Sequence, residues 1–180
     1  MPRSLVLLTA LLLAATAGAA ERLTLESSIE VEDGDTLLID IDGQQTRIQL
    51  AGIDAPEDSD NPKFRVDLKR TRLSAEQLLP LGRVATEQLR YLIREQGPFV
   101  LHFDPERKDR YGRTPGDLVN ASGDSISAQM VANGYAIPLG RGLPADLARR
   151  LGALEARARA DSKGLWGLYP QETRRWSGHR

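Results

Sequence analysis

The sequence predicts a domain of the α+β class, in which a small β-barrel of short strands carries helices. Polar and apolar residues alternate, with the period of a half-buried strand, over segments 23–31, 37–41, 46–50 and 99–103. Apolar stripes, caps or stop signals typical of helices mark segments 84–93, 125–133 and 144–162. No internal repeat is visible, so these segments are expected to build one domain.

The clearest strand pair is a hairpin. Apolar residues alternate over 37–41, and Asp42-Gly43 is a turn signal because glycine accepts the positive φ that a type I′ turn requires. The return strand is expected over 46–50, with its isoleucine and leucine facing the core. Arg47 and Gln49 therefore share the other face of that strand, toward the rim of the barrel.

The segment after the hairpin combines a polar stretch with helical signals. Residues 58–73 contain five lysines and arginines, and we interpret them as an exposed loop or a partly ordered insert. Ser74 begins a capping box, and Pro80 is expected to interrupt the helix that starts there. A firmer helix follows over 84–93 and stops at Gly97-Pro98.

The second half of the chain alternates between strands and helices. A strand over 99–103 is followed by a short one that begins at Leu118-Val119. Ser125 can cap a helix that ends at Asn133, and the last long helix is expected over 144–162. Trp166 then anchors that helix to the core. The order β-β-β-α-β-β-α-α, with short strands, indicates a small barrel that carries helices, in the α+β class.

The first 20 residues have the pattern of a secretory signal peptide. Arg3 supplies a basic start, an apolar run over 5–15 is too short for the roughly 20 residues of a membrane span, and Ala17-Gly18-Ala19 resembles a cleavage site. We therefore divide the chain into a leader (1–20), one domain (21–170) and a C-terminal tail (171–180). An exported protein, periplasmic or secreted from a bacterium, is expected.

Composition excludes several classes of site. The chain of 180 residues has 24 lysines and arginines, 25 acidic residues, no cysteine and two histidines. Without cysteine there is no disulfide, thiolate metal site or cysteine nucleophile, and two histidines make a multi-histidine zinc site untenable. The net charge of −1 rules out binding of polyanions by bulk charge, so any contact with nucleic acid must be local.

Two acidic segments flank the hairpin. Asp33-Gly34-Asp35 precedes the first strand, and Asp54-Ala55-Pro56-Glu57 follows the second, so antiparallel pairing brings both segments to one rim. Carboxylates that converge there repel one another unless a cation lies between them, and oxygen ligands select Ca²⁺, Mg²⁺ or Mn²⁺. Taken singly, each segment is also explained as a turn with Asx-type hydrogen bonds.

Three motifs occur together in one order. Val31-Glu32-Asp33-Gly34-Asp35-Thr36, Gly52-Ile53-Asp54-Ala55-Pro56-Glu57 and Asp109-Arg110-Tyr111-Gly112-Arg113 resemble those of the thermonuclease family, the staphylococcal-nuclease-like domain. The resemblance covers about 23–166, nearly the whole chain after the leader. It implies a five-stranded OB-fold barrel with about three helices. It also implies Ca²⁺-dependent hydrolysis of phosphodiester bonds in DNA and RNA, with Mg²⁺ or Mn²⁺ as alternatives.

The resemblance also implies roles for individual residues. The calcium ligands are expected to be Asp35, Asp54 and the main-chain carbonyl of Ala55. The carboxylate that positions or deprotonates the attacking water is expected to be Glu57, and the phosphate-binding arginine Arg113. Two further positions, Tyr111 and Arg110, match residues that touch the nucleotide.

One position departs from the family pattern. A second catalytic arginine normally lies five residues before the aspartate of the Ile-Asp-Ala-Pro-Glu turn, and here that position is Gln49. An amide can donate hydrogen bonds to phosphate but carries no charge. Arg47, two residues earlier, either reaches the phosphate instead or only covers the barrel surface, and the basic insert after Glu57 is another source of charge.

Two functions follow as hypotheses. The first is an exported Ca²⁺-dependent nuclease that is slower than one with both arginines; the second is a non-catalytic OB-fold module that binds nucleic acid. Both predict DNA or RNA as the partner, a monomer, and no stable membrane insertion once the leader is removed.

Overall fold

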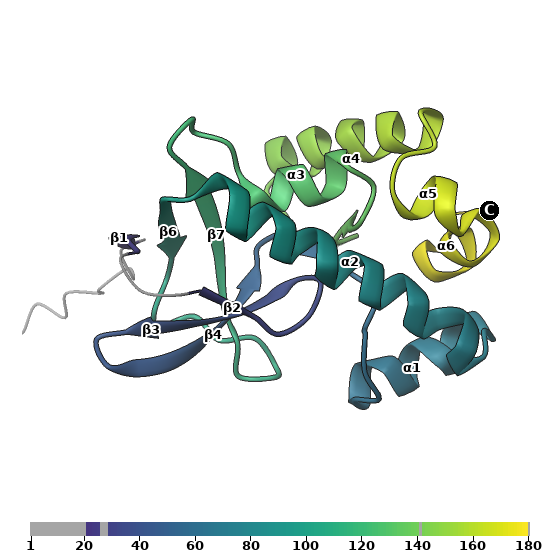
Figure 1. Ribbon diagram of the computed structural model, residues 1–180, viewed down its shortest axis with the longest axis horizontal. Helices are drawn as coiled ribbons and strands as arrows, with labels where there is room; N and C mark the ends of the chain where they lie inside the picture. Colours follow the sequence, from purple (N-terminus) through teal and green to yellow (C-terminus); the bar gives the residue numbers. More distant parts are fainter. Residues whose placement is uncertain (1–20, 26–28, 141, 180) are drawn as a thin grey trace, which may run out of the picture.

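In the computed structural model, which describes residues 21–25, 29–140 and 142–179, a curled sheet lies at one end of the molecule and a group of helices at the other (Figure 1). The predicted signal peptide lies outside these described residues. The longest helix runs between the two ends. The predicted α+β class is confirmed, and the sheet fits an OB-fold domain.

The main sheet has six strands in the order β1-β6-β7-β4-β3-β2, and a second sheet pairs β5 with β8. The strands are β1 (Glu21–Thr24), β2 (Ile29–Val31), β3 (Thr36–Ile41), β4 (Gln44–Leu50), β5 (Ile53–Asp54), β6 (Phe99–Phe103), β7 (Thr114–Asn120) and β8 (Ile137–Pro138). All neighbouring pairs are antiparallel except β4 and β7, which are parallel. Parallel pairing requires a crossover connection, and here the connection is the segment 51–113, which contains helices.

The β3–β4 hairpin has the predicted register, in which Thr36 pairs with Gln49 and Ile41 with Gln44. Asp42 and Gly43 have φ values of 54° and 79°, as a type I′ turn requires. Its inward side chains join leucines, isoleucines and phenylalanines of β6, β7 and the helices in the main core. Burial of this apolar surface is what fixes the register, because a slip by one residue would turn the core face outward.

The structure has six helical segments within the described residues, against about three expected. They are α1 (Pro62–Thr71), α2 (Ala75–Gln96), α3 (Ile126–Ala132), α4 (Ala145–Ala160), α5 (Leu165–Leu168) and α6 (Pro170–Ser177). The expected interruption at Pro80 is wrong, since α2 continues through it. Proline costs a helix one hydrogen bond, but Leu78, Leu81 and Leu89 are fully buried on one face and hold both parts in place.

The interpretation of 58–73 as a loop is also wrong, because α1 occupies most of this segment. Asn61 caps the helix by accepting a hydrogen bond from Phe64 N, and Pro62 stands in its first turn, where a missing N–H costs nothing. Phe64 is 2% exposed and lies in a second core, which is distinct from the main one. The charged residues on either side of Phe64 in the sequence made this segment resemble an exposed loop.

This second core also includes residues beyond position 170. Trp176 of α6 is 1% exposed and packs with Phe64, Leu73 and Leu165. Arg70 of α1 donates to Trp176 O at 2.7 Å. The segment 171–180, separated above as a tail, therefore contributes a helix that is packed against α1 and α2. Among the described residues, none of the helices is both long enough and apolar enough to span a membrane.

Candidate active site

The turn between β2 and β3 presents two buried carboxylates. Asp33 is 8% exposed and accepts a hydrogen bond from Asp35 N at 3.0 Å, which is the Asx-type turn that the sequence also allows. Asp35 is 2% exposed, and Thr36 Oγ1 donates to its Oδ1 at 3.2 Å. Gly34 between them packs against Ala55 and leaves no room for a side chain. The turn thus fits closely under the other acidic segment.

The two acidic segments meet, as the hairpin pairing predicts. Asp35 Oδ2 accepts a hydrogen bond from Ala55 N at 2.8 Å, across 20 positions of sequence. Asp54 lies at the end of β5, where pairing with Ile137 of β8 holds its backbone. The three proposed cation ligands, Asp35, Asp54 and Ala55, therefore come from two rigid turns.

Glu57 is held from several sides. It is 4% exposed, and Asn61 Nδ2 donates to its Oε2. The next residue, Asp58, accepts a hydrogen bond from the fully buried Thr86 of α2 at 2.8 Å. A carboxylate held in this way keeps one orientation, which a group that positions a water molecule needs.

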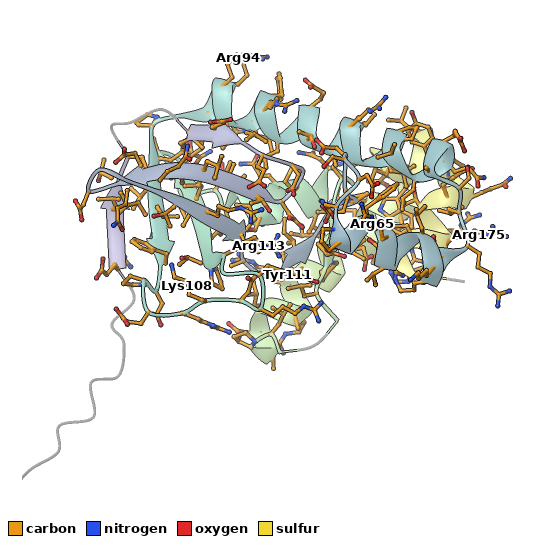
Figure 2. The ribbon with its side chains drawn as sticks, turned by 90° about the horizontal axis from the view of Figure 1, so that it is seen from below. Arg65, Arg94, Lys108, Tyr111, Arg113 and Arg175 are labelled. Atoms are coloured by element: carbon orange, nitrogen blue, oxygen red, sulfur yellow. The ribbon has the colours of Figure 1, made fainter. Side chains whose placement is uncertain are left out.

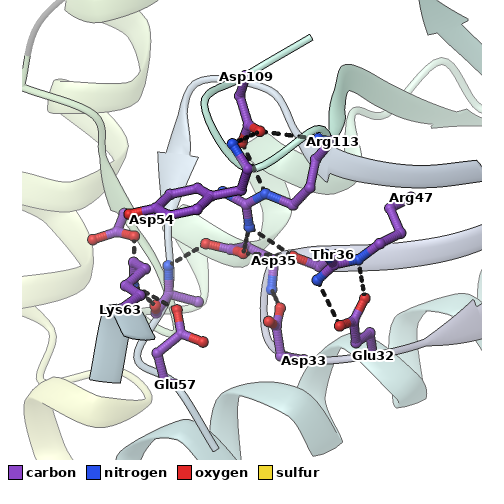
Figure 3. Close-up of polar contacts among 12 residues, drawn as sticks. Glu32, Asp33, Asp35, Thr36, Arg47, Asp54, Glu57, Lys63, Asp109 and Arg113 are labelled. Atoms are coloured by element: carbon purple, nitrogen blue, oxygen red, sulfur yellow. Dashed lines mark hydrogen bonds and ion pairs between the residues drawn. The ribbon is translucent and has the colours of Figure 1, made fainter. Parts of the chain in front are cut away.

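Lys63 enters this site from the first turn of α1. Its ammonium lies 2.7 Å from Glu57 Oε1, 3.0 Å from Asp54 Oδ1 and 3.1 Å from the carbonyl oxygen of Ala55 (Figure 3). The sequence placed it only within a basic insert that could supply a charge. A helix capped at Asn61 would have placed Lys63, six residues after Glu57, in its first turn and close to that carboxylate.

Arg113 approaches the carboxylates from the loop before β7. Its Nη1 donates to Thr36 Oγ1 at 3.0 Å and lies 3.7 Å from Asp35 Oδ1. Asp109 organises this loop: its Oδ1 accepts from the backbone N–H groups of Tyr111 and Arg113, and its Oδ2 accepts from Arg113 Nε at 2.8 Å. Asp109 belongs to the predicted motif, but sequence reasoning gave it no role.

The aromatic ring of Tyr111 lies beside Arg113 at the surface (Figure 2). Tyr111 is 42% exposed, and the guanidinium carbons of Arg110 and Arg113 lie 4.9 and 5.4 Å from its ring centroid. A ring that is half free can stack on a base. Arg110 is exposed to solvent and its guanidinium lies over this ring, but it does not line the adjacent cavity.

The two candidates for the second arginine position differ. Arg47 lines the cavity, where Glu32 holds it through two hydrogen bonds of 2.6 and 2.7 Å. Gln49 was expected to point to the rim beside Arg47, but it is 8% exposed and does not line the cavity. Its Oε1 is buried without a hydrogen-bond partner. Residue 49 pairs with Thr36 of β3 and with Pro115 of β7, so it lies on an interior strand, which the pattern of β4 alone does not reveal.

These side chains surround one cavity of about 300 Å³. Acidic, basic, amide and aromatic groups share its wall, which is formed by Glu32, Asp33, Arg47, Glu57, Asp58, Ser59, Asn61, Pro62, Lys63, Tyr111 and Arg113. The turns hold the carboxylates on one side, and Arg47 approaches from β4 and Arg113 from the loop before β7 (Figure 3). A ligand with both negative charge and a ring system is complementary to such a wall.

Burial and charge shift the pKa values in opposite directions around the cavity. Burial, together with the charges of Asp35 and Glu57, raises the pKa of Asp33 to about 8. Burial alone would lower the pKa of Lys63, but the carboxylates, Asp54 foremost, raise it, so the ammonium stays charged. Burial likewise lowers and Asp35 raises the pKa of Arg113, with a net increase. The site therefore holds the permanent positive charges of Lys63 and Arg113 among its buried carboxylates.

A family model described as "Staphylococcal nuclease homologue" matches residues 47–167. The chain belongs to this family. Endonuclease YhcR of Bacillus subtilis is 31% identical over 141 residues, which is 76% of this chain and 11% of that protein. The thermonucleases of Staphylococcus intermedius and Staphylococcus hyicus are 37% and 34% identical over 84 and 86 residues.

The aligned segments cover less than half of the length of each relative. The aligned segments span about a tenth of the Bacillus endonuclease and 42% and 43% of the two thermonucleases. They cover 47% and 48% of this chain in the thermonuclease alignments. Membership of the staphylococcal nuclease family is shown, and the relatives that match carry the names of nucleases.

The ligand atoms that the site offers are of the chemical type that binds a hard divalent cation. Asp35, Asp54, Glu57 and the Ala55 carbonyl offer oxygen alone, and a positive charge, the Lys63 ammonium, already lies among three of these groups. As the side chains stand, no three acidic or histidine residues in the described part of the chain are grouped as a metal site. The oxygens are present, but Lys63 takes up the space between them.

Proposed function

We propose that this chain is an exported nuclease that hydrolyses phosphodiester bonds in DNA, RNA or both. One observation carries the proposal: the buried carboxylates of Asp33 and Glu57, the Arg113 guanidinium and the exposed Tyr111 ring border a single cavity. Phosphate complements the guanidinium, and a base complements the ring. Membership of the staphylococcal nuclease family supports this reading, and the leader-like sequence of residues 1–20 supports export.

Arg113 is suited to stabilise charge in the transition state. Hydrolysis of a phosphodiester builds negative charge on the non-bridging oxygens, and a donor fixed before reaction loses no free energy to reorganisation. Asp109 and Thr36 hold the Arg113 guanidinium at Nε and Nη1, and its side chain is 12% exposed. Its position beside the cavity brings a permanent charge to the phosphate.

Glu57 is suited to act as the base. Its carboxylate is buried at the cavity wall, with Asn61 fixing one oxygen. A water molecule between Glu57 and a bound phosphate would transfer one proton to this carboxylate as its oxygen bonds to phosphorus and the bond from phosphorus to the leaving ester oxygen breaks. A divalent cation held by Asp35, Asp54 and the Ala55 carbonyl would polarise the phosphate and lower the pKa of the attacking water.

The proposed activity is tested by cleavage of plasmid DNA and of a fluorescent RNA, each with Ca²⁺ or with EDTA. We expect cleavage with Ca²⁺ and none with EDTA. Removal of one positioned donor typically lowers the rate by about 10²–10³, so Arg113→Ala and Glu57→Gln should each lower turnover on that scale. Arg94→Ala is the control, because Arg94 lies on the far edge of α2, away from Tyr111 and Arg113 (Figure 2).

A binding module is the second candidate, and burial of Gln49 in place of an arginine favours it. Such a module would bind a labelled oligonucleotide in a fluorescence anisotropy titration but leave it intact with Ca²⁺, Mg²⁺ or Mn²⁺. Binding without cleavage under all three cations would replace the nuclease proposal with this one.

A further inference from the structure

The Lys63 ammonium has no hydrogen-bond donor left for a substrate. An ammonium group carries three N–H donors. Lys63 directs them at Asp54 Oδ1, Glu57 Oε1 and the Ala55 carbonyl, at 3.0, 2.7 and 3.1 Å. In this position Lys63 neutralises the carboxylates but cannot also hold a phosphate oxygen. It is therefore not a replacement for a catalytic metal ion, which keeps coordination positions open for water and substrate.

Two of these three oxygens, Asp54 Oδ1 and the Ala55 carbonyl, belong to the ligands that the proposed divalent cation would require. Ca²⁺ binds six to eight oxygens at roughly 2.3–2.6 Å, so it needs Asp54 and the Ala55 carbonyl at close range. The ammonium already lies within about 3 Å of both of these groups. Two cations that share ligands at this distance repel each other strongly in a buried site. Binding of one requires departure of the other.

A second place for the ammonium lies one helical turn away. Asp67 of α1 is 7% exposed at its side chain, and its Oδ2 lies 3.6 Å from Lys63 Nζ. This oxygen is buried without a hydrogen-bond partner, whereas Oδ1 accepts from Arg70. A buried carboxylate oxygen without a donor is costly, so it favours any approach of the ammonium. Lys63 needs only a change of rotamer to reach it.

We propose that Lys63 is an internal competitor of the divalent cation: it occupies the cation position in the resting protein and moves to Asp67 when a divalent cation binds. The inference concerns the cation of the nuclease site and so rests on the proposed function. Departure of Lys63 also releases Glu57 Oε1, so the base and the cation ligands become available in one step. The lysine keeps the site assembled before the cation arrives.

Ca²⁺ binding to the purified chain, followed by isothermal titration calorimetry, tests the competition without any nucleic acid. Lys63→Met removes the competitor and should tighten Ca²⁺ binding by about tenfold or more, a difference of about 1.4 kcal/mol. Asp67→Asn removes the charged alternative site and should weaken Ca²⁺ binding. Lys69→Met is the matched control, because Lys69 is an exposed lysine of the same helix and its loss changes the net charge equally.

Equal Ca²⁺ affinities for Lys63→Met and Lys69→Met would overturn the proposal, as would the absence of Ca²⁺ binding in all variants. Because Lys63→Met leaves buried carboxylates without a counter-charge, the unaltered chain provides a second test. It has four lysines, so ¹⁵N-labelled lysine Nζ signals are few. We expect one slowly exchanging Nζ signal that shifts on Ca²⁺ saturation and returns with EDTA. A signal that ignores bound Ca²⁺ would contradict the exchange of positions.

These measurements separate the two proposals. Competition for Ca²⁺ without cleavage of DNA or RNA would leave the role of Lys63 intact and reject the nuclease. Cleavage with equal Ca²⁺ affinity in both lysine variants would do the reverse.

Discussion

Gly82 of α2 lies against the backbone of Glu57 so closely that a Cβ at position 82 would stand 2.1 Å from the Glu57 carbonyl oxygen. The atoms that such a Cβ would meet belong to the backbone of Glu57 and Asp58, so no flexible side chain could move to make room for it. The same helix holds the next residue, since Thr86 donates to Asp58. Helix α2 thus supports the Asp54–Glu57 turn, and the position of Glu57, the proposed base, depends on the absence of a side chain at residue 82.

Gly82→Ala is therefore expected to displace Glu57 and to lower both stability and turnover. Forcing extra atoms into a packed region typically costs about 1–3 kcal/mol. Urea unfolding and plasmid cleavage measure the two effects. Gly152→Ala is the matched control: residue 152 also lies in a helix, has open space around its Cα, and should gain about 0.5–1 kcal/mol from alanine. If Gly82→Ala behaves like Gly152→Ala, the close contact does not position the turn.

Asp109 is expected to support Arg113 in a pH-dependent way. Partial burial acts to raise its pKa, but hydrogen bonds from Arg113 and from Tyr111 N outweigh this and lower the pKa of Asp109. A lowered folded-state pKa adds stability above the unfolded value of about 3.9, and this stability is lost as pH falls through the folded-state pKa. Asp109→Asn should therefore destabilise the chain near pH 7.

The destabilisation by Asp109→Asn should shrink as the pH falls below about 4, where the unaltered carboxyl also becomes protonated. Chemical unfolding from pH 7 to pH 3 measures the difference. A difference that stays constant over this range would mean that the Asp109 charge does not contribute.

Arg47, rather than Gln49, is expected to supply the second positive charge at the phosphate. Arg47 lines the cavity, and its guanidinium has the planar fork that binds phosphate in two places. Arg47→Ala should lower kcat/KM strongly. Gln49→Met, which removes the buried unpaired Oε1 at similar volume, should leave kcat/KM unchanged and raise stability by about 1 kcal/mol at most. The opposite ranking in steady-state kinetics would assign the phosphate contact to residue 49.

Calcium is expected to stabilise the chain through Asp54. A ligand that binds only the folded state adds about 2.7 kcal/mol at 100 times its Kd. A thermal scan with saturating Ca²⁺ should therefore raise Tm, and Asp54→Asn should abolish the increase. EDTA should restore the metal-free Tm in the unaltered chain. An increase that persists in Asp54→Asn would place the cation elsewhere.

The barrel could be predicted because its signals are local. Alternation over 37–41 and 46–50 and the Asp42-Gly43 turn specify a hairpin within 14 residues, and the structure has this hairpin in the predicted register. The meeting of Asp35 with the Ala55 backbone follows from that register. Family motifs then identified the loop of Tyr111 and Arg113.

What the sequence did not reveal depends on contacts between distant segments. Helix α1 looks like a charged loop because its few apolar residues are interspersed with lysines and arginines, and Trp176, the partner of Phe64, lies 112 positions away. Lys63 reaches the carboxylates only because this helix forms. Gln49 likewise lies on an interior strand only because of β7, which pairs with β4 after a crossover of some sixty residues. No pattern within one segment records such contacts.

The second core has a consequence for where this domain can be cut. The family match ends at residue 167, before α6, yet Trp176 fills the core that supports α1. A version trimmed to the matched boundary would leave Phe64, Leu73 and Leu165 without their largest neighbour. Helix α1, which carries Lys63, would then lose part of the apolar core against which it packs. Helix α6 thus supports the position of Lys63, which lies in the first turn of α1. A boundary chosen from the family match alone would remove this helix.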